Sequence, residues 1–82
     1  MKKIVMFSAS WCNPCKQAKP VFNKIKESSN NVEFEIVDID ENRDMANDFG
    51  VTSVPTFMLI ENDEEVSRFV GAQNVVRIRE ML

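Results

Sequence analysis

The only two cysteines of the chain, Cys12 and Cys15, are three residues apart near the start of an 82-residue sequence. If a helix begins here, both thiols lie in its first turn, and their Cα atoms fall within the roughly 4.4–6.8 Å that a disulfide requires. A disulfide between them closes too short a loop to restrict the unfolded chain, so it is a poor structural staple. The spacing therefore indicates a bond that forms and breaks without a change of fold.

A metal site is an alternative use of two cysteines at this spacing. Zinc normally takes four ligands from Cys, His and carboxylate side chains, and the sequence has no His and no further Cys. Lys16 stands where a haem-attachment motif has histidine. We expect redox chemistry with no metal and no cofactor; a metal shared between two chains and thiols without chemistry are the alternatives.

The predicted helix start separates the roles of the two sulfur atoms. Free backbone N–H groups and the helix dipole favour a negative charge at Cys12, and Lys16 adds a positive charge nearby unless it is an ordinary solvated lysine. Cys12 should therefore attack the disulfide of a partner protein, after which the better shielded Cys15 attacks Cys12 and releases the reduced partner. Pro14 fits the first helical turn, and Asn13 can hydrogen-bond to the local backbone.

Two elements must position this pair. Residues 2–8 contain the continuous apolar run Ile4–Phe7, which is typical of a central strand buried on both faces. After the cysteines, apolar residues recur at helical spacing and predict a helix that is kinked by Pro20. The residues on its predicted buried face are Cys15, Ala18, Phe22 and Ile25.

The remainder of the chain continues the alternation of strands and helices. We expect a strand from Val32 to Asp40, a short helix capped by Asp40 or Asn42 and ended at Gly50, strands at Val54–Ile60 and Val66–Val70, and a final helix that buries Val75, Ile78 and Leu82. The order β-α-β-α-β-β-α predicts an α/β fold with a four-stranded mixed sheet. With 82 residues, the chain should form a single domain over residues 1–82.

Composition excludes several classes of protein. The apolar run at the start is too short for a signal peptide, and no stretch approaches the 18 apolar residues of a membrane span, so we expect a cytoplasmic protein without membrane contact. Residues 1–26 hold six lysines and no acid, while the remaining residues hold four arginines and thirteen acids, which gives a net charge of -3. This balance argues against a nucleic-acid surface.

The hexapeptide WCNPCK at residues 11–16 resembles the WCGPCK site of the thioredoxin family. The likeness extends to VDIDEN at residues 37–42, to FGVTSVPTF at residues 49–57 and to VGA at residues 70–72. Four matching stretches in the same order are far more specific than a CxxC motif alone. The resemblance implies a minimal thioredoxin-like fold without the usual first strand and helix, and the activity of a protein-disulfide reductase that carries electrons.

The resemblance also implies a set of site residues around the cysteines. Pro55 would be a cis proline facing the pair, and the backbone of Val54 would pair with an extended segment of the substrate. Trp11, Gly71 and Ala72 would complete a flat apolar rim, although ordinary packing and a turn would also explain Trp11 and Gly71. The implied partners of a monomer are thioredoxin reductase as electron donor and disulfide-containing proteins, such as ribonucleotide reductase, as acceptors.

Three residues depart from the family pattern. Asn13 replaces a glycine inside the motif, Met6 stands where the family has a buried aspartate, and Ile36 stands where it has the lysine partner of that aspartate. Without the aspartate, Cys15 should lose its proton to solvent or to the departing thiolate, so the resolving step should be slow. The remaining positive neighbourhood should hold the pKa of Cys12 below the value of about 8.5 that is usual for a free thiol.

Two other functions remain open at this point. A glutaredoxin-like protein recharged by glutathione would suit the short length, but such proteins have Pro-Tyr between the cysteines and this chain has Asn-Pro and no Tyr. A non-catalytic binding module with incidental thiols would keep its function when both cysteines become serine, since a fold alone does not decide function.

Overall fold

The computed structural model describes all residues from Met1 to Leu82. Its elements follow one another as β1 (Lys2–Ser8), α1 (Asn13–Glu27), β2 (Val32–Asp38), α2 (Arg43–Asp48), β3 (Thr56–Glu61), β4 (Glu64–Val70), the 3-10 helix η1 (Ala72–Arg77) and α3 (Ile78–Met81). The predicted order of strands and helices is confirmed. The strand predicted from Val54 begins only at Thr56, because Pro55 has no N–H to donate to a strand ladder.

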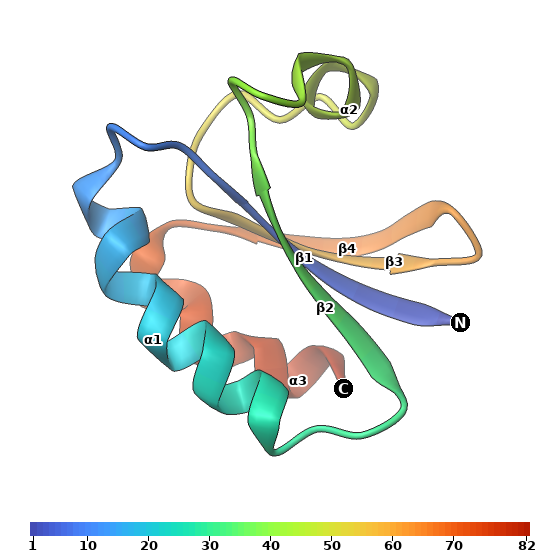
Figure 1. The fold of residues 1–82 in the computed structure, drawn as a ribbon. Helices are drawn as coiled ribbons and strands as arrows, with labels where there is room; N and C mark the ends of the chain where they lie inside the picture. The colour runs from blue at the N-terminus through green and yellow to red at the C-terminus, as the bar shows by residue number, and fades with distance from the viewer.

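The sheet has four strands in the order β2-β1-β3-β4. The apolar first strand lies inside it, parallel to β2 and antiparallel to β3, as its sequence predicts (Figure 1). β3 and β4 form the predicted hairpin, and both residues of its turn, Asn62 and Asp63, have positive φ angles. Asn and Asp tolerate this conformation, which matches the right-handed twist of the two strands.

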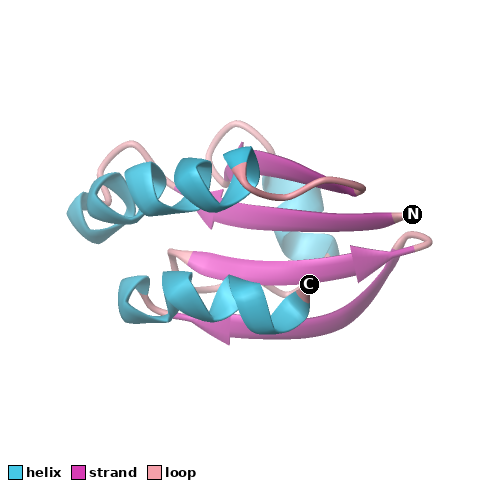
Figure 2. Ribbon diagram, turned by 90° about the horizontal axis from the view of Figure 1, so that it is seen from below, coloured by secondary structure: helices cyan, strands magenta, loops and turns pink.

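Helices lie on both faces of the sheet. α1, η1 and α3 cover one face, where Figure 2 shows α1 and the C-terminal helical segment next to each other, while α2 lies on the other face. Side chains of a strand point alternately to its two faces. Ile4 and Met6 of β1 accordingly belong to the cluster under α1, whereas Val5 and Phe7 belong to the cluster under α2.

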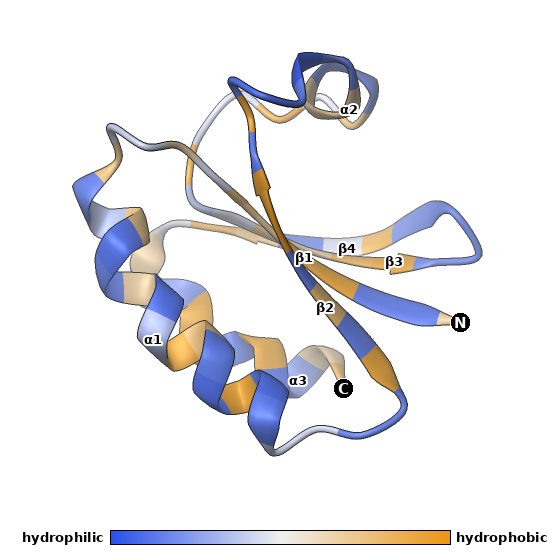
Figure 3. Cartoon of the chain, viewed as in Figure 1, coloured by the Kyte–Doolittle hydropathy of each residue, from blue (hydrophilic) through white to orange (hydrophobic).

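Helix α1 buries the predicted face. Cys15, Ala18, Phe22 and Ile25 are all buried, and hydrophilic residues occupy most of the outer surface of the helix (Figure 3). The ring of Phe22 packs edge-on against Phe34 and stacks on Phe57. Pro20 lies inside the helix and is exposed, and the kink expected there remains a prediction.

The last helical segment differs from its prediction. We expected Leu82 on the buried face, but Leu82 is exposed and Met81 is buried in its place. The reason is that the segment begins as a 3-10 helix, in which residues three apart lie above one another. Val75, Ile78 and Met81 follow this spacing and enter the core together.

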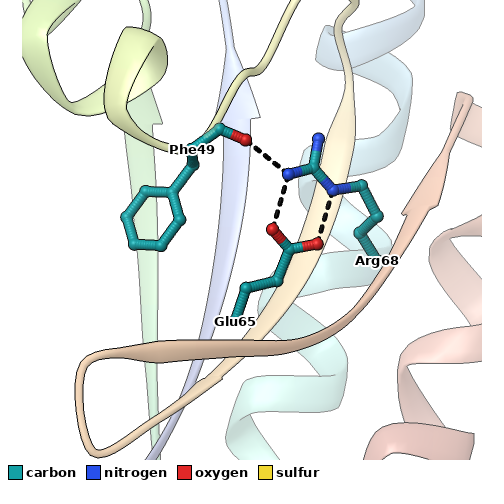
Figure 4. Close-up of polar contacts among 3 residues, drawn as sticks. All are labelled: Phe49, Glu65 and Arg68. Atoms are coloured by element: carbon teal, nitrogen blue, oxygen red, sulfur yellow. Dashed lines mark hydrogen bonds and ion pairs between the residues drawn. The ribbon is translucent and has the colours of Figure 1, made fainter.

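Paired charges cover part of the second face, because α2 reaches only one end of it (Figure 1). Lys3 pairs with Glu35 at 2.9 Å across β1 and β2. On β4, two nitrogen atoms of the Arg68 guanidinium donate hydrogen bonds to the carboxylate of Glu65. One of them also donates to the carbonyl of Phe49 at the end of α2 (Figure 4). The apolar stems of such side chains can shield a core while the charged ends stay in water.

Candidate active site

The cysteine pair lies where α1 begins. Cys12 is the N-cap residue, and its Sγ accepts a hydrogen bond of 3.2 Å from the backbone N–H of Cys15. The N–H of Cys12 in turn donates to the carbonyl of Ala9. Pro14 occupies the first turn, where a helix has no use for a backbone donor. The first turn contains no acidic side chain, so the partial positive charge of the helix end acts on the Cys12 sulfur without competition.

The two cysteines are joined by a disulfide, with their Cα atoms 5.3 Å apart. Cys12 is 4% exposed and Cys15 is fully buried. Cys12 is thus slightly the more exposed of the two cysteines, and their roles as attacking and resolving sulfurs remain predictions. Cys12 is nevertheless more enclosed than its helix-end position alone suggests, because it packs into the same apolar cluster as Ala9 and Cys15. Little of the Cys12 residue is therefore in contact with solvent.

The loop before β3 lies beside the cluster that holds the disulfide. The Val54–Pro55 peptide bond is cis, Pro55 is buried and Val54 is half-buried. The N–H of Gly71 donates to the carbonyl of Pro55 at 2.9 Å. This bond brings the end of β4 to the proline, and both Val54 and Ala72 pack against the cluster that contains the two cysteines.

Gly71 needs to be glycine at this point. Its φ angle is 106°, in the region that side chains disfavour. A Cβ added there would lie 2.6 Å from the side-chain oxygen of Gln73. The structure thus places two segments, Val54–Pro55 and Gly71–Ala72, side by side, with Val54 and Ala72 against the cluster that contains the cysteines.

Trp11 directly precedes the N-cap and is 65% exposed. Its indole N–H donates a hydrogen bond of 2.9 Å to a carboxylate oxygen of Asp40. No local pattern in the sequence contains a sign of this contact, and we assigned Asp40 only as a possible cap of α2. The parallel pairing of β1 and β2 supplies that sign, because the loops that follow two parallel strands leave the sheet at the same edge.

The capping prediction for α2 is confirmed in the position of Asn42 but not in its side-chain bond. Asn42 is the N-cap residue, but its side chain makes no capping bond and instead donates to the carbonyl of Asp38. Asp38 accepts the backbone N–H groups of Asp40 and Glu41, which closes a turn before the helix. A side chain that bonds its own turn is no longer free to cap the helix.

The two remaining residues of the motif face solvent. Lys16 is exposed and forms no ion pair with any acidic residue of the chain. Asn13 is exposed too. The hydrogen bond expected from the Asn13 side chain to the local backbone is absent from the structure. Both side chains are therefore available to a partner rather than engaged in holding the site together.

The interior behind the disulfide is apolar. Met6 is fully buried in the cluster of the cysteines, and Ile36, its register partner on β2, is 37% exposed at the sheet edge. The only buried polar residues of the chain are Ser8 and Thr56, and neither is ionisable. The site thus has no buried acid or base that could take a proton from Cys15.

No three His, Cys, Asp or Glu side chains come together in a group that could hold a metal ion. Among the helices, none combines the length and the apolar character needed to cross a membrane.

The chain is thus an α/β protein. Its four-stranded mixed sheet lies between helices, and a disulfide within a CxxC motif lies at the start of α1. The sequence model of the family described as "Thioredoxin" matches residues 1–82. The chain belongs to the thioredoxin family.

Individual relatives agree with this assignment. The chain is 41% identical to thioredoxin H2 of Arabidopsis thaliana over 85% of its own length and 53% of that protein, and 42% identical to human thioredoxin over 84% of its own length and 66% of that protein. It superimposes on the crystal structure of Fasciola hepatica thioredoxin with a TM-score of 0.90 and 39% identity, over 98% of this chain and 76% of the other. The chain thus spans between one half and two thirds of the length of these two sequence relatives.

Proposed function

We propose that this chain reduces disulfides of partner proteins through reversible opening of the Cys12–Cys15 disulfide. The observation that carries the proposal is the position of the Cys12 sulfur, which caps α1 and accepts the N–H of Cys15. A hydrogen bond and a helix dipole that act on the same sulfur both favour its thiolate over its thiol. The thiolate is the form of cysteine that attacks disulfides.

The reaction then has two exchanges of sulfur bonds. In the reduced chain, the Cys12 thiolate attacks one sulfur of the partner's disulfide, and the other partner sulfur leaves with the electron pair and takes a proton from water. Cys15 next loses its proton and attacks Cys12. The Cys12–partner bond breaks, the second partner sulfur leaves as a thiolate, and the chain is left with its own disulfide. The fixed geometry of the two cysteines makes the second exchange intramolecular, which raises its rate.

We assign Trp11, Val54, Pro55, Gly71 and Ala72 to partner binding. The large exposed area of Trp11 supports this role, since exposed aromatic side chains often anchor protein contacts. An extended segment of the partner would pair with the backbone of Val54, while Asn13, Pro14 and Lys16 lie on the exposed first turn of α1. A shallow surface of this kind suits a protein disulfide rather than a small enclosed ligand.

The family supports a reductase as electron donor and disulfide-containing proteins as acceptors. More narrowly, we propose thioredoxin reductase as the donor, ribonucleotide reductase as one acceptor, and a cytoplasmic protein acting as a single domain. No metal or cofactor takes part in the proposed reaction.

The test is a coupled assay of protein-disulfide reduction with either NADPH and thioredoxin reductase or glutathione as the source of electrons. The wild-type chain should turn over with the reductase. Cys12→Ser should abolish activity, and Cys15→Ser should accumulate a mixed disulfide with the partner that mass spectrometry detects. Turnover with glutathione alone would indicate the glutaredoxin-like alternative. Unchanged biological function after both substitutions together would instead indicate a binding module.

A further inference from the structure

Ser8 carries the only buried side-chain oxygen or nitrogen in the structure that has no hydrogen-bond partner. The residue is 2% exposed, and the other buried hydroxyl, that of Thr56, donates to the carbonyl of Ser53 at 2.7 Å. Buried polar groups are nearly always paired in folded proteins, and an unpaired one is costly. The hydroxyl of Ser8 therefore calls for a physical explanation.

The position of Ser8 in β1 places it under the start of α1. Ile4 and Met6 belong to the cluster that contains both cysteines, and alternation along the strand puts Ser8 on the same face. Ser8 is also the last residue of β1, and the chain runs from it directly into the turn that leads to Cys12. It is thus the β1 residue on this face that is nearest along the chain to the disulfide.

The other residues packed around the cysteines cannot interact with a buried charge on Cys15. Those of β1, α1, β3 and η1 in the same cluster are apolar. Asp38 is the register partner of Ser8 on β2, but one of its carboxylate oxygens already accepts two backbone N–H groups. The remaining charged groups on the elements around the cluster all lie outside the core. They are Lys2 and Lys3 at the far end of β1, Lys16, Lys19, Lys24, Lys26 and Glu27 on α1, Glu33 and Glu35 on β2, Glu61 on β3, Arg77 on η1, and Arg79 and Glu80 on α3.

We propose that Ser8 is a positioning residue for the resolving sulfur: its hydroxyl lacks a partner while the disulfide is closed and donates a hydrogen bond to the Cys15 thiolate when the disulfide is open. The proposal rests on the reaction described above. Disulfide sulfur is a weak acceptor, whereas a thiolate is a charged one, and hydrogen bonds to charged groups are the stronger kind. An apolar surrounding would otherwise oppose the negative charge on Cys15.

The role of Ser8 leaves the balance of the resolving step unchanged. Cys15 gives its proton to water, and the electron pair of its thiolate forms the bond to the Cys12 sulfur. The bond between Cys12 and the partner breaks, and the partner sulfur takes that electron pair and then a proton from water. Ser8 keeps its own proton throughout and only stabilises the thiolate that attacks.

Two consequences follow for the redox properties of the chain. Resolution of the mixed disulfide should depend on the hydroxyl, because the attacking thiolate forms more readily beside a donor. The hydroxyl should also favour the reduced form at equilibrium, because it gains a partner only when the disulfide opens. Removing it should therefore slow the resolving step and make the disulfide harder to reduce.

Ser8→Ala tests both consequences, with Ser29→Ala as a matched control. Ser29 donates to the carbonyl of Ile25 at the far end of α1, so its loss removes a hydroxyl away from the disulfide. At a pH that ionises Cys15 in the reduced chain, the equilibrium of Ser8→Ala with a glutathione redox buffer should move toward the disulfide by about tenfold, which corresponds to about 30 mV, and the shift should be smaller at neutral pH. The mixed disulfide should resolve roughly tenfold to hundredfold more slowly at neutral pH, in line with the strength of a hydrogen bond to a charged group.

The pH profile and a conservative variant complete the experiment. The rate of resolution in Ser8→Ala should rise toward the wild-type rate as the pH increases, because hydroxide then replaces the missing stabilisation of the thiolate. Ser8→Thr keeps a hydroxyl and should retain the wild-type redox equilibrium. If Ser8→Ala does not fold, Ser8→Gly removes the same hydroxyl and should give the same shifts.

The proposal is overturned if Ser8→Ala changes the free energy of unfolding equally in the oxidised and reduced forms and leaves the resolution rate unaltered. That result would make Ser8 a purely structural residue, while a wild-type chain that still reduces protein disulfides would keep its proposed function. Conversely, a wild-type chain that reduces no protein disulfide, together with a shifted glutathione equilibrium in Ser8→Ala, would reject the function and retain the contact with Cys15.

Discussion

The two faces of the sheet protect their apolar side chains in different ways. The face under α1 is covered by helices along its length, and its core holds the disulfide. The face under α2 is covered by one short helix and by the charged pairs of Lys3 with Glu35 and of Arg68 with Glu65. The first face is apolar and holds the disulfide, whereas the second depends on side chains that remain in contact with water.

This difference has an energetic consequence. Burial of apolar area dominates the stability of the first face, and it varies little with salt or pH. Pairs of partly exposed charges contribute much less each, and their contribution falls when either group loses its charge. Substitutions on the two faces should therefore differ in both the size and the pH dependence of their effects.

The largest effect should come from Phe22→Ala on the first face. The Phe22 ring is fully buried between Phe34 and Phe57, so its loss leaves a cavity that the helix and the sheet cannot close. We expect the free energy of unfolding to fall by about 3–5 kcal/mol. Denaturant unfolding measures it, with Val21→Ala as control on the outer side of the same helix, where the change should stay within about 0.5 kcal/mol. Equal effects of the two substitutions would contradict the assignment of faces.

A slightly smaller effect is expected from Met6→Asp, which puts an acid into the dry region behind the disulfide. A buried carboxylate without a partner should cost about 3 kcal/mol at neutral pH. Burial raises the pKa of such a carboxyl above its unfolded value of about 3.9, so the loss should be small below that pH and should grow as the pH rises. Unfolding at pH 4 and pH 7 measures the difference.

Ile36→Lys provides the matched second substitution for Met6→Asp. Ile36 is the register partner of Met6 and is partly exposed, so a lysine there could reach both water and the new carboxylate. The double variant should recover part of the stability lost at pH 7. Two results would contradict this reasoning: a loss of stability in Met6→Asp that does not change with pH, or no recovery of stability in the double variant. Either would show that water reaches the side chain at position 6 despite its burial.

Most of the first face could be predicted from sequence, because strong periodic patterns determine it. The apolar run of β1 and the spacing of Cys15, Ala18 and Phe22 each allow one arrangement that buries them. The position of Cys12 at a helix start follows from the same patterns. A pattern fails only where its period changes, as at Leu82, where 3-10 geometry brings Met81 into the core instead.

The contacts that sequence reasoning missed join residues far apart in the chain. The bond between Trp11 and Asp40 depends on β1 and β2 being parallel and in register. The unpaired hydroxyl of Ser8 depends on every group around it, so no local pattern reveals it. The bond from Arg68 to the carbonyl of Phe49 likewise joins two elements whose approach is set by the whole fold.

The smallest effect, and the one most specific to the second face, should come from Glu65→Gln. The hydrogen bonds from Arg68 hold the pKa of Glu65 below its usual value of 4.5, which means that the folded chain binds this proton less readily than the unfolded chain. The resulting stabilisation is fully present above the unfolded pKa and is lost as the pH falls through the lower, folded pKa. Glu65→Gln should therefore cost about 0.5–1 kcal/mol at pH 7 and progressively less below about pH 4.5.

Glu64→Gln is the matched control, because Glu64 is an exposed neighbour on the same strand without an ion pair. Its unfolding free energy should follow that of the wild type at pH 7 and at pH 3.5, both measured in urea. Added salt should reduce the cost of Glu65→Gln at pH 7, since salt screens partly exposed pairs. It should leave the cost of Phe22→Ala nearly unchanged. If Glu64→Gln and Glu65→Gln gave the same pH profile, the charged cover over the second face would contribute nothing to stability, and apolar packing under α2 would have to sustain that face alone.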